Sequence, residues 1–333
     1  MRLRTGAALF GVWLAGPGMA ALSGEEHSLM PDGVRLRGPV ERVREYRVEV
    51  RSSETGELVE SAYREFMQEL RFDSGRLVYA RSYLSASDDI LESFLPPRPF
   101  FPVPAVDAWY TTRATYFGER LAGVTRSSDD GLATETWQFE ASGLLQTLER
   151  NTRYLEPGTY LPDPESRTVA RFSYIYDGQR RLDRTIGTIG GEIIYRESRQ
   201  RNQRSCLTRV SIQDADLREV RDYECDDACR PVRITIGGRQ MELEYDSGGM
   251  LTQWNLFSAS EPVASTRYVY NEVGDPIEIA EETFGESVMR NRSYTYDANG
   301  NWTRMQEVVR SEDAPDDQQE TFVLIRKIEY RSP

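Results

Sequence analysis

Histidine and lysine are almost missing from this chain of 333 residues, in which His27 and Lys327 are single copies. The single imidazole disfavours most imidazole-based chemistry, including catalytic triads that need histidine and zinc sites rich in histidine. Arginine therefore carries the positive charge, and the 41 basic residues are outnumbered by 54 acidic ones, which gives a formal net charge of -13. Such a charge repels a phosphate backbone, so we expect no nucleic-acid partner.

Long apolar runs are also absent, and the apolar run near the start ends at Leu14. It is too short for the roughly 20 residues of a membrane-spanning helix. Arg2 and Arg4 precede the run and small residues follow it up to Ala20, an order that is typical of a secretory signal peptide. We therefore expect cleavage after Ala20 and a periplasmic or secreted protein without a membrane span.

Three parts follow from this pattern: a signal peptide over 1–20, a flexible N-terminal segment over 21–40, and one β-hairpin repeat domain over 41–333. The hydrophobic fraction of 39% is sufficient for a core. Five prolines between Leu95 and Pro104 interrupt the strand pattern, because proline removes a ladder donor. We expect a short helix and a Pro-rich crossover over 87–110, with a domain boundary there as the alternative.

Cysteine is scarce, with three copies at Cys206, Cys225 and Cys229. An odd number leaves one thiol outside any disulfide in an oxidising compartment. The short spacing favours a disulfide between Cys225 and Cys229 across a tight turn. The competing pair is Cys206 with Cys225, which would face each other if the chain reverses midway between them. A zinc site lacks a fourth ligand, and we expect no metal and no cofactor.

What the sequence does contain is a repeat, seen as alternating aromatic residues followed by Asp or Asn and then Gly. The step from Tyr245 to Tyr270 is 25 residues, and the step from Tyr270 to Tyr296 is 26. Alternation places the aromatic residues on one face of a strand, Asp or Asn begins a turn, and Gly accepts its positive φ. We therefore expect an all-β chain of antiparallel hairpins, with Gly300 at such a turn. The four clearest copies are YIYDGQRRLDR, LEYDSGGMLTQW, YVYNEVGDPIE and YTYDANGNWTR, and weaker copies lie around Phe72 and Phe139.

These segments resemble the YD repeats of the RHS family, most closely over 241–305. The family motif Tyr-Asp-x-x-Gly-x-Leu is met most fully from Tyr245 to Leu251, and Trp302 replaces its Leu in the last copy. The resemblance implies an elongated, curled antiparallel sheet and an association with carbohydrate binding or surface display. This chain has fewer repeats than the large family shells that enclose a toxin.

Aromatic residues are plentiful, with 18 Tyr, 12 Phe and 5 Trp. Exposed aromatic rings bind sugars by stacking, with their polar edges adding hydrogen bonds. The structural alternative is that the same rings pair across strands and fill the concave side of the sheet. The candidate ligand-binding residues are Tyr174, Tyr176, Tyr245, Trp254, Tyr270, Tyr296 and Trp302.

The repeated Asp residues, such as Asp246 and Asp297, invite comparison with the paired carboxylates of glycosidases. Their position at hairpin turns already accounts for them, and acidic clusters elsewhere lack the spacing of a calcium loop. We therefore expect a non-catalytic exported binding or scaffold protein whose partner is a glycan polymer or an envelope protein. An outer-membrane β-barrel is the second class and a carboxylate-dependent glycosidase the third.

Overall fold

The computed structural model describes most of the chain as β-strand and contains no helix in the described ranges. The predicted signal peptide and the predicted helix with its crossover, as far as residue 107, lie outside these ranges, and residues 108–110 begin a strand. Segment 61–70, whose aromatic spacing also fits a helix, lies within a strand. The described residues are 36–52, 58–73, 76–84, 108–117, 120–128, 131–140, 142–154, 167–214, 218–311 and 319–331.

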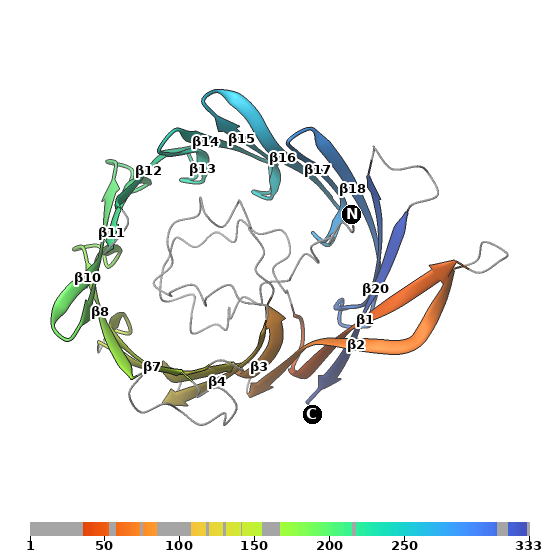
Figure 1. Cartoon of the computed structure of the whole chain (residues 1–333), viewed down its shortest axis with the longest axis horizontal. Coiled ribbons are helices and arrows are strands. Elements are labelled where there is room, and N and C mark those ends of the chain that lie inside the picture. The colour runs from red at the N-terminus through yellow and green to blue at the C-terminus, as the bar shows by residue number, and fades with distance from the viewer. Residues whose placement is uncertain are drawn as a thin grey trace. The chain divides into compact units, whose positions relative to one another are not determined.

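The chain divides into two compact units, and each is all-β (Figure 1). Unit 1 comprises the described residues from Arg71 to Cys229, and unit 2 those of 36–70 and of 230–331. The first strands are β1 (Val40–Ser52), β2 (Leu58–Asp73), β3 (Arg76–Leu84), β4 (Ala108–Phe117), β5 (Arg120–Ser128), β6 (Gly131–Phe139) and β7 (Leu145–Tyr154). Then follow β8 (Thr168–Tyr176), β9 (Leu182–Ile189), β10 (Glu192–Arg201), β11 (Leu207–Asp214), β12 (Arg218–Cys225), β13 (Pro231–Ile236) and β14 (Arg239–Tyr245). The last are β15 (Leu251–Ser258), β16 (Glu261–Tyr270), β17 (Pro276–Thr283), β18 (Glu286–Tyr296), β19 (Trp302–Ser311) and β20 (Glu320–Tyr330).

Consecutive strands pair antiparallel within each unit, as the sequence pattern predicts. In unit 1 the pairs run from β3–β4 to β11–β12, and in unit 2 from β13–β14 to β19–β20, where β1 also pairs with β20. Two kinds of turn alternate along the chain. Three of the tight turns have two central residues with positive φ, at Gly190-Gly191, Ala259-Ser260 and Phe284-Gly285. This conformation matches the right-handed twist of the paired strands.

The second kind of turn is wider and coincides with the sequence repeat. In the copy that starts at Asp297, the N–H of Gly300 donates to the Asp297 carbonyl, and the N–H of Asp297 donates to the Asn301 carbonyl. The Asp297 carboxylate oxygen Oδ1 accepts two further backbone N–H groups, those of Asn299 and Asn301, each at 2.9 Å. This is a type I turn that ends in a residue of positive φ, and it explains why the four clearest copies have Asp or Asn first.

The positive-φ position of the wide turn is filled by Gly300 at φ 78°, which confirms its predicted conformation. The weaker copy around Phe139 also forms a wide turn, with Gly143 in this position. Two further wide turns begin at Asn202 and Asp226. The cysteine spacing predicted a turn at the second position, but neither turn was recognised as a repeat copy, because the positive-φ position holds Ser205 in the first and Cys229 in the second.

One face of each sheet is buried, and strand alternation determines which side chains reach it. In unit 1, Leu145, Leu148, Phe172 and Leu182 form an apolar cluster. In unit 2 the buried face also holds charged residues. The Arg326 guanidinium donates to Glu45 at 2.8 Å, and both side chains are almost inaccessible to solvent. Charges buried in this way need a partner, which ties β1 to β20.

A pair of glycines in unit 1 tests the conformational requirement of the wide turn. A Cβ added at Gly143 or at Gly178 would meet nothing within 4 Å, but φ is +93° at Gly143 and is outside the left-handed region at Gly178. Gly143→Ala should therefore lower the free energy of unfolding by about 1 kcal/mol, and Gly178→Ala should leave it unchanged or raise it slightly. Urea unfolding of the two variants checks this, and equal midpoints would contradict it.

Candidate functional site

The tyrosines of the repeat in unit 2 use their hydroxyl groups to hold neighbouring hairpins together. Tyr245 donates to the Pro231 carbonyl at 2.9 Å, and Tyr270 donates to the Leu251 carbonyl at 2.5 Å. Each donor immediately precedes a wide turn, and each acceptor immediately follows the preceding wide turn. We call such a side-chain bond a turn tie. Because a turn tie occupies the phenolic hydroxyl, that group is already engaged within the fold.

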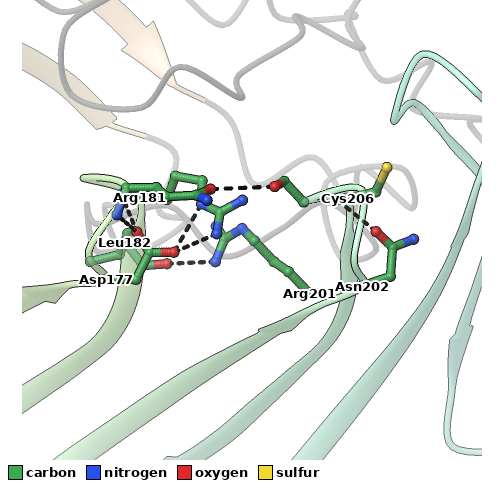
Figure 2. Close-up of polar contacts among 8 residues, drawn as sticks. Asp177, Arg181, Leu182, Arg201, Asn202 and Cys206 are labelled. Carbon is green, nitrogen blue, oxygen red and sulfur yellow. Dashed lines mark hydrogen bonds and ion pairs between the residues drawn. The ribbon is translucent and has the colours of Figure 1, made fainter.

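Unit 1 has the same ties with different donors (Figure 2). Tyr176 donates its hydroxyl to the Leu145 carbonyl at 2.9 Å. Arg201 fills the equivalent position and donates to the Leu182 carbonyl at 3.0 Å, beside the Asp177–Arg181 ion pair that Figure 2 shows. The next hairpin has Cys225 at this position, with its Sγ 3.3 Å from the Leu207 carbonyl.

The disulfide joins Cys206 to Cys229, with their α carbons 4.9 Å apart. The prediction of a bond between Cys225 and Cys229 is therefore wrong, and the competing Cys206–Cys225 bond is not formed either. Spacing along the chain favoured a bridge within one turn. In the sheet, however, the turn that ends at Cys206 neighbours the turn that contains Cys229, while the Cys225 side chain is directed at the Leu207 carbonyl.

The other predicted aromatic candidates are largely committed to structure. Trp254 is buried, and Trp302 is buried with the Arg326 guanidinium 3.3 Å above the centre of its ring. Tyr296 donates to the Asp275 carboxylate at 2.6 Å, which ties it to the preceding wide turn. These three residues, with Tyr245 and Tyr270, belong to unit 2. Only Tyr174 and Tyr176 of the seven predicted residues lie in unit 1.

Tyr174 and Tyr176 line a concavity of about 470 Å³ between two neighbouring wide turns of unit 1. The two turns begin at Glu140 and Asp177. The concavity combines aromatic rings, aliphatic carbon, an amide, a hydroxyl, carboxylates and a guanidinium, a mixture suited to a polar ligand with one apolar face. Its lining residues are Glu140, Ser142, Leu144, Gln146, Tyr174, Ile175, Tyr176, Asp177 and Arg180.

Sequence reasoning missed the polar members of this lining, because they belong to the weak repeat copy and to variable turn positions. Arg180 donates to the Ser142 carbonyl at 2.7 Å and so joins the two turns. The Ser142 hydroxyl donates to the Glu140 carboxylate at 3.0 Å. Gln146, on the strand after the first turn, is exposed. The two turns begin 37 residues apart, outside the repeat step of 25 or 26, so nothing in the sequence indicated that they would be neighbours.

Two ionisable residues of the lining, Asp177 and Tyr176, have shifted pKa values. The Arg181 side chain donates to Asp177 and lowers the pKa of that carboxyl to about 2. Burial, reinforced by the Glu140 charge, raises the pKa of Tyr176 to about 12. Asp177 is therefore a carboxylate and Tyr176 a neutral phenol over the ordinary pH range. A general acid or base needs a pKa near the working pH, so the two groups are better suited to binding than to proton transfer.

Two further features concern metals and membranes. Across the described ranges, no group of three or more His, Cys, Asp or Glu side chains is arranged to hold a metal ion. None of the described segments forms a helix with the length and apolar character that a membrane crossing requires.

These features define an all-β protein of repeated hairpins with tied wide turns. No protein-family model and no curated protein matches the chain. It is similar in fold to a porin-like protein from Bacteroides uniformis ATCC 8492, with 13% identity and a TM-score of 0.33, over 88% of this chain and 99% of that one. It is also similar to the Photorhabdus luminescens Tc holotoxin pore, with 11% identity and a TM-score of 0.34, over 85% of this chain and 18% of that one. Scores this low carry no weight for function.

The Asp177–Arg181 pair predicts a specific acid sensitivity. A carboxyl whose pKa is lowered by folding contributes stability above about pH 4 and loses it as the pH falls toward about 2. Asp177→Asn keeps an oxygen to accept the turn N–H groups, as Asn202 does, but removes the charge. It should therefore reduce the stability lost between these pH values. A double-mutant cycle with Arg181→Gln, measured by urea unfolding at several pH values, gives the interaction energy of the pair. If the effects of the two substitutions on the free energy of unfolding are additive, the predicted interaction is contradicted.

The hydroxyl of Tyr176 predicts an alkaline sensitivity of opposite sign. Because its pKa is raised in the folded state, its contribution is complete below about pH 10 and is lost as the pH rises toward about 12. Tyr176→Phe removes the bond to the Leu145 carbonyl and should cost about 1 kcal/mol at pH 8. It should also weaken the alkaline loss of stability. Urea unfolding midpoints of the wild type and of Tyr176→Phe at rising pH test this. An equal loss of stability above about pH 10 in the two proteins would reject it.

Proposed function

We propose that the chain is an exported, non-catalytic binding protein of the YD-repeat type, which holds a glycan or an envelope protein on its aromatic-rich sheet. The concavity of unit 1 is the observation that carries this proposal. There, Tyr174 and Tyr176, whose rings also pack in the apolar cluster of unit 1, line the same concavity as Glu140, Gln146 and Arg180. Aromatic rings beside amide, carboxylate and guanidinium groups suit a sugar ring, which has apolar faces and a rim of hydroxyl groups.

Three further features support parts of the proposal. The Cys206–Cys229 disulfide is compatible with an oxidising compartment and so with export. The tyrosine ties give the repeat a structural reason for its Tyr-Asp pair, which supports the YD-repeat assignment. The repeated carboxylates of Asp177 and Asp297 serve their own turns, which supports binding without catalysis.

Blocking the concavity tests the site directly. Gln146→Trp places a bulky side chain at an exposed lining position, and Gln213→Trp places the same side chain at an exposed position of β11 outside the lining. Mature protein would be screened against a glycan array and against purified envelope proteins. Capture of a glycan or envelope protein should fall at least about tenfold for Gln146→Trp and stay unchanged for Gln213→Trp, because only the first occupies the contact volume.

The same samples would be assayed for hydrolysis of every captured glycan. Turnover by the wild-type chain that disappears in Asp177→Asn, with the thermal midpoint retained, would overturn the non-catalytic assignment. Capture that is equal for both Trp variants would remove the concavity as the binding site.

A further inference from the structure

The three cysteines of unit 1 occupy three defined positions in two neighbouring wide turns. Cys206 is the last residue of the turn that begins at Asn202, whose side-chain oxygen accepts its N–H at 3.1 Å. Cys225 is the turn-tie residue of the next hairpin, and Cys229 holds the positive-φ position of its turn, at φ 62°. One disulfide and one thiol therefore lie within a single inter-hairpin contact.

The strand register places Cys225 opposite Cys206. β11 and β12 pair antiparallel with Arg209 opposite Asp222. Extending this register by three residues toward the wide turns aligns Cys206 with Cys225. Opposite residues of antiparallel strands have α carbons about 4.5 to 5.5 Å apart, which is within the range that a disulfide spans. The Cys225 Sγ also contacts the carbonyl of Leu207, the residue directly after Cys206, at 3.3 Å.

We propose that these cysteines form an intramolecular thiol–disulfide switch. The Cys225 thiol loses its proton to solvent, and the thiolate attacks Sγ of Cys206. A Cys206–Cys225 bond forms as the Cys206–Cys229 bond breaks, and Cys229 leaves as a thiolate that takes a proton from water. One disulfide and one thiol are present before and after the step. The exchange therefore needs no external oxidant or reductant.

Loop closure does not decide between the two disulfides. The existing bond joins residues 23 apart in the sequence, and Cys206 and Cys225 are 19 apart. In the chain-entropy model the two closed loops differ by a factor of only about 1.3 in equilibrium constant. Local contacts decide the balance instead. The bond from the Cys225 thiol to the Leu207 carbonyl stabilises the form with the Cys206–Cys229 disulfide, and it is lost when Cys225 joins Cys206.

The two forms differ in what holds the turn that begins at Asp226. In the present form, the disulfide at Cys229 and the ion pair between Arg204 and Asp227 both fasten this turn to the preceding one. After the exchange, the covalent link lies at the base of the hairpin, and the turn keeps the ion pair but loses the disulfide. The switch thus releases one turn of unit 1 and presents a thiol at Cys229, which is only partly buried.

Labelling the thiol of the intact mature protein tests the switch. Samples held at about pH 8.5, where thiolates form, would be quenched over time with a maleimide. Trypsin leaves Cys225 and Cys229 in one peptide, 222–233, so the labelled cysteine is identified by fragmentation or by a further cleavage before Asp226. The label should start on Cys225 and appear on Cys229 in at least about a tenth of the chains at equilibrium.

Two serine variants complete the experiment. Cys225→Ser should keep the Cys206–Cys229 disulfide and take up no label, while Cys229→Ser should form the Cys206–Cys225 disulfide on exposure to air. Thermal midpoints of both variants check that they fold. A label that remains on Cys225 throughout in the wild type, or two persistent thiols in a folded Cys229→Ser variant, would overturn the proposal.

Discussion

At five of the described wide turns, the backbone carbonyl that follows the turn accepts a hydrogen bond from the side chain that precedes the next wide turn. In unit 2 the donor is a tyrosine hydroxyl, as in Tyr245 and Tyr270. In unit 1 the corresponding donors are Tyr176, the guanidinium of Arg201 and the thiol of Cys225. Partly buried carbonyl groups require a hydrogen-bond donor. The residue before each of these turns must therefore have a side chain that is long enough to reach the carbonyl and that can donate, and it need not be aromatic.

This constraint explains which repeats were visible in the sequence. The copies at Tyr245, Tyr270 and Tyr296 combine a tyrosine before the turn with Asp or Asn and Gly, so their turns and strand alternation were predicted correctly. The turns at Asn202 and Asp226 were not recognised as repeat copies because the tie and the positive-φ position hold other residue types. Asp or Asn five residues before a resumed strand is the signal that all of them share. The disulfide depends on which hairpins are neighbours, which spacing along the chain does not reveal.

Aromatic content alone was a poor guide to the site. The same residue types serve in ties, in the core and beside buried charge, and Trp302 under Arg326 illustrates the last case. Tyr174 and Tyr176 gain their place in a concavity only because β7 pairs with β8, which brings the turn at Glu140 beside the turn at Asp177. The two turns begin 37 residues apart in the sequence, compared with a step of 25 or 26 between the clear copies, so no regular repeat step linked them in advance.

The ties also bear on how such a surface would bind. The side chains that line the concavity belong to turns already fixed by the Tyr176 tie, the Asp177 turn bonds and the Arg180 contact with Ser142. A ligand that enters would immobilise few additional groups, and binding loses less conformational entropy when the site is already ordered. The turn that begins at Asp226 is fastened to its neighbour in a different way, by the disulfide at Cys229. Exchange of that link would change the order of one turn while leaving the turns around the concavity tied.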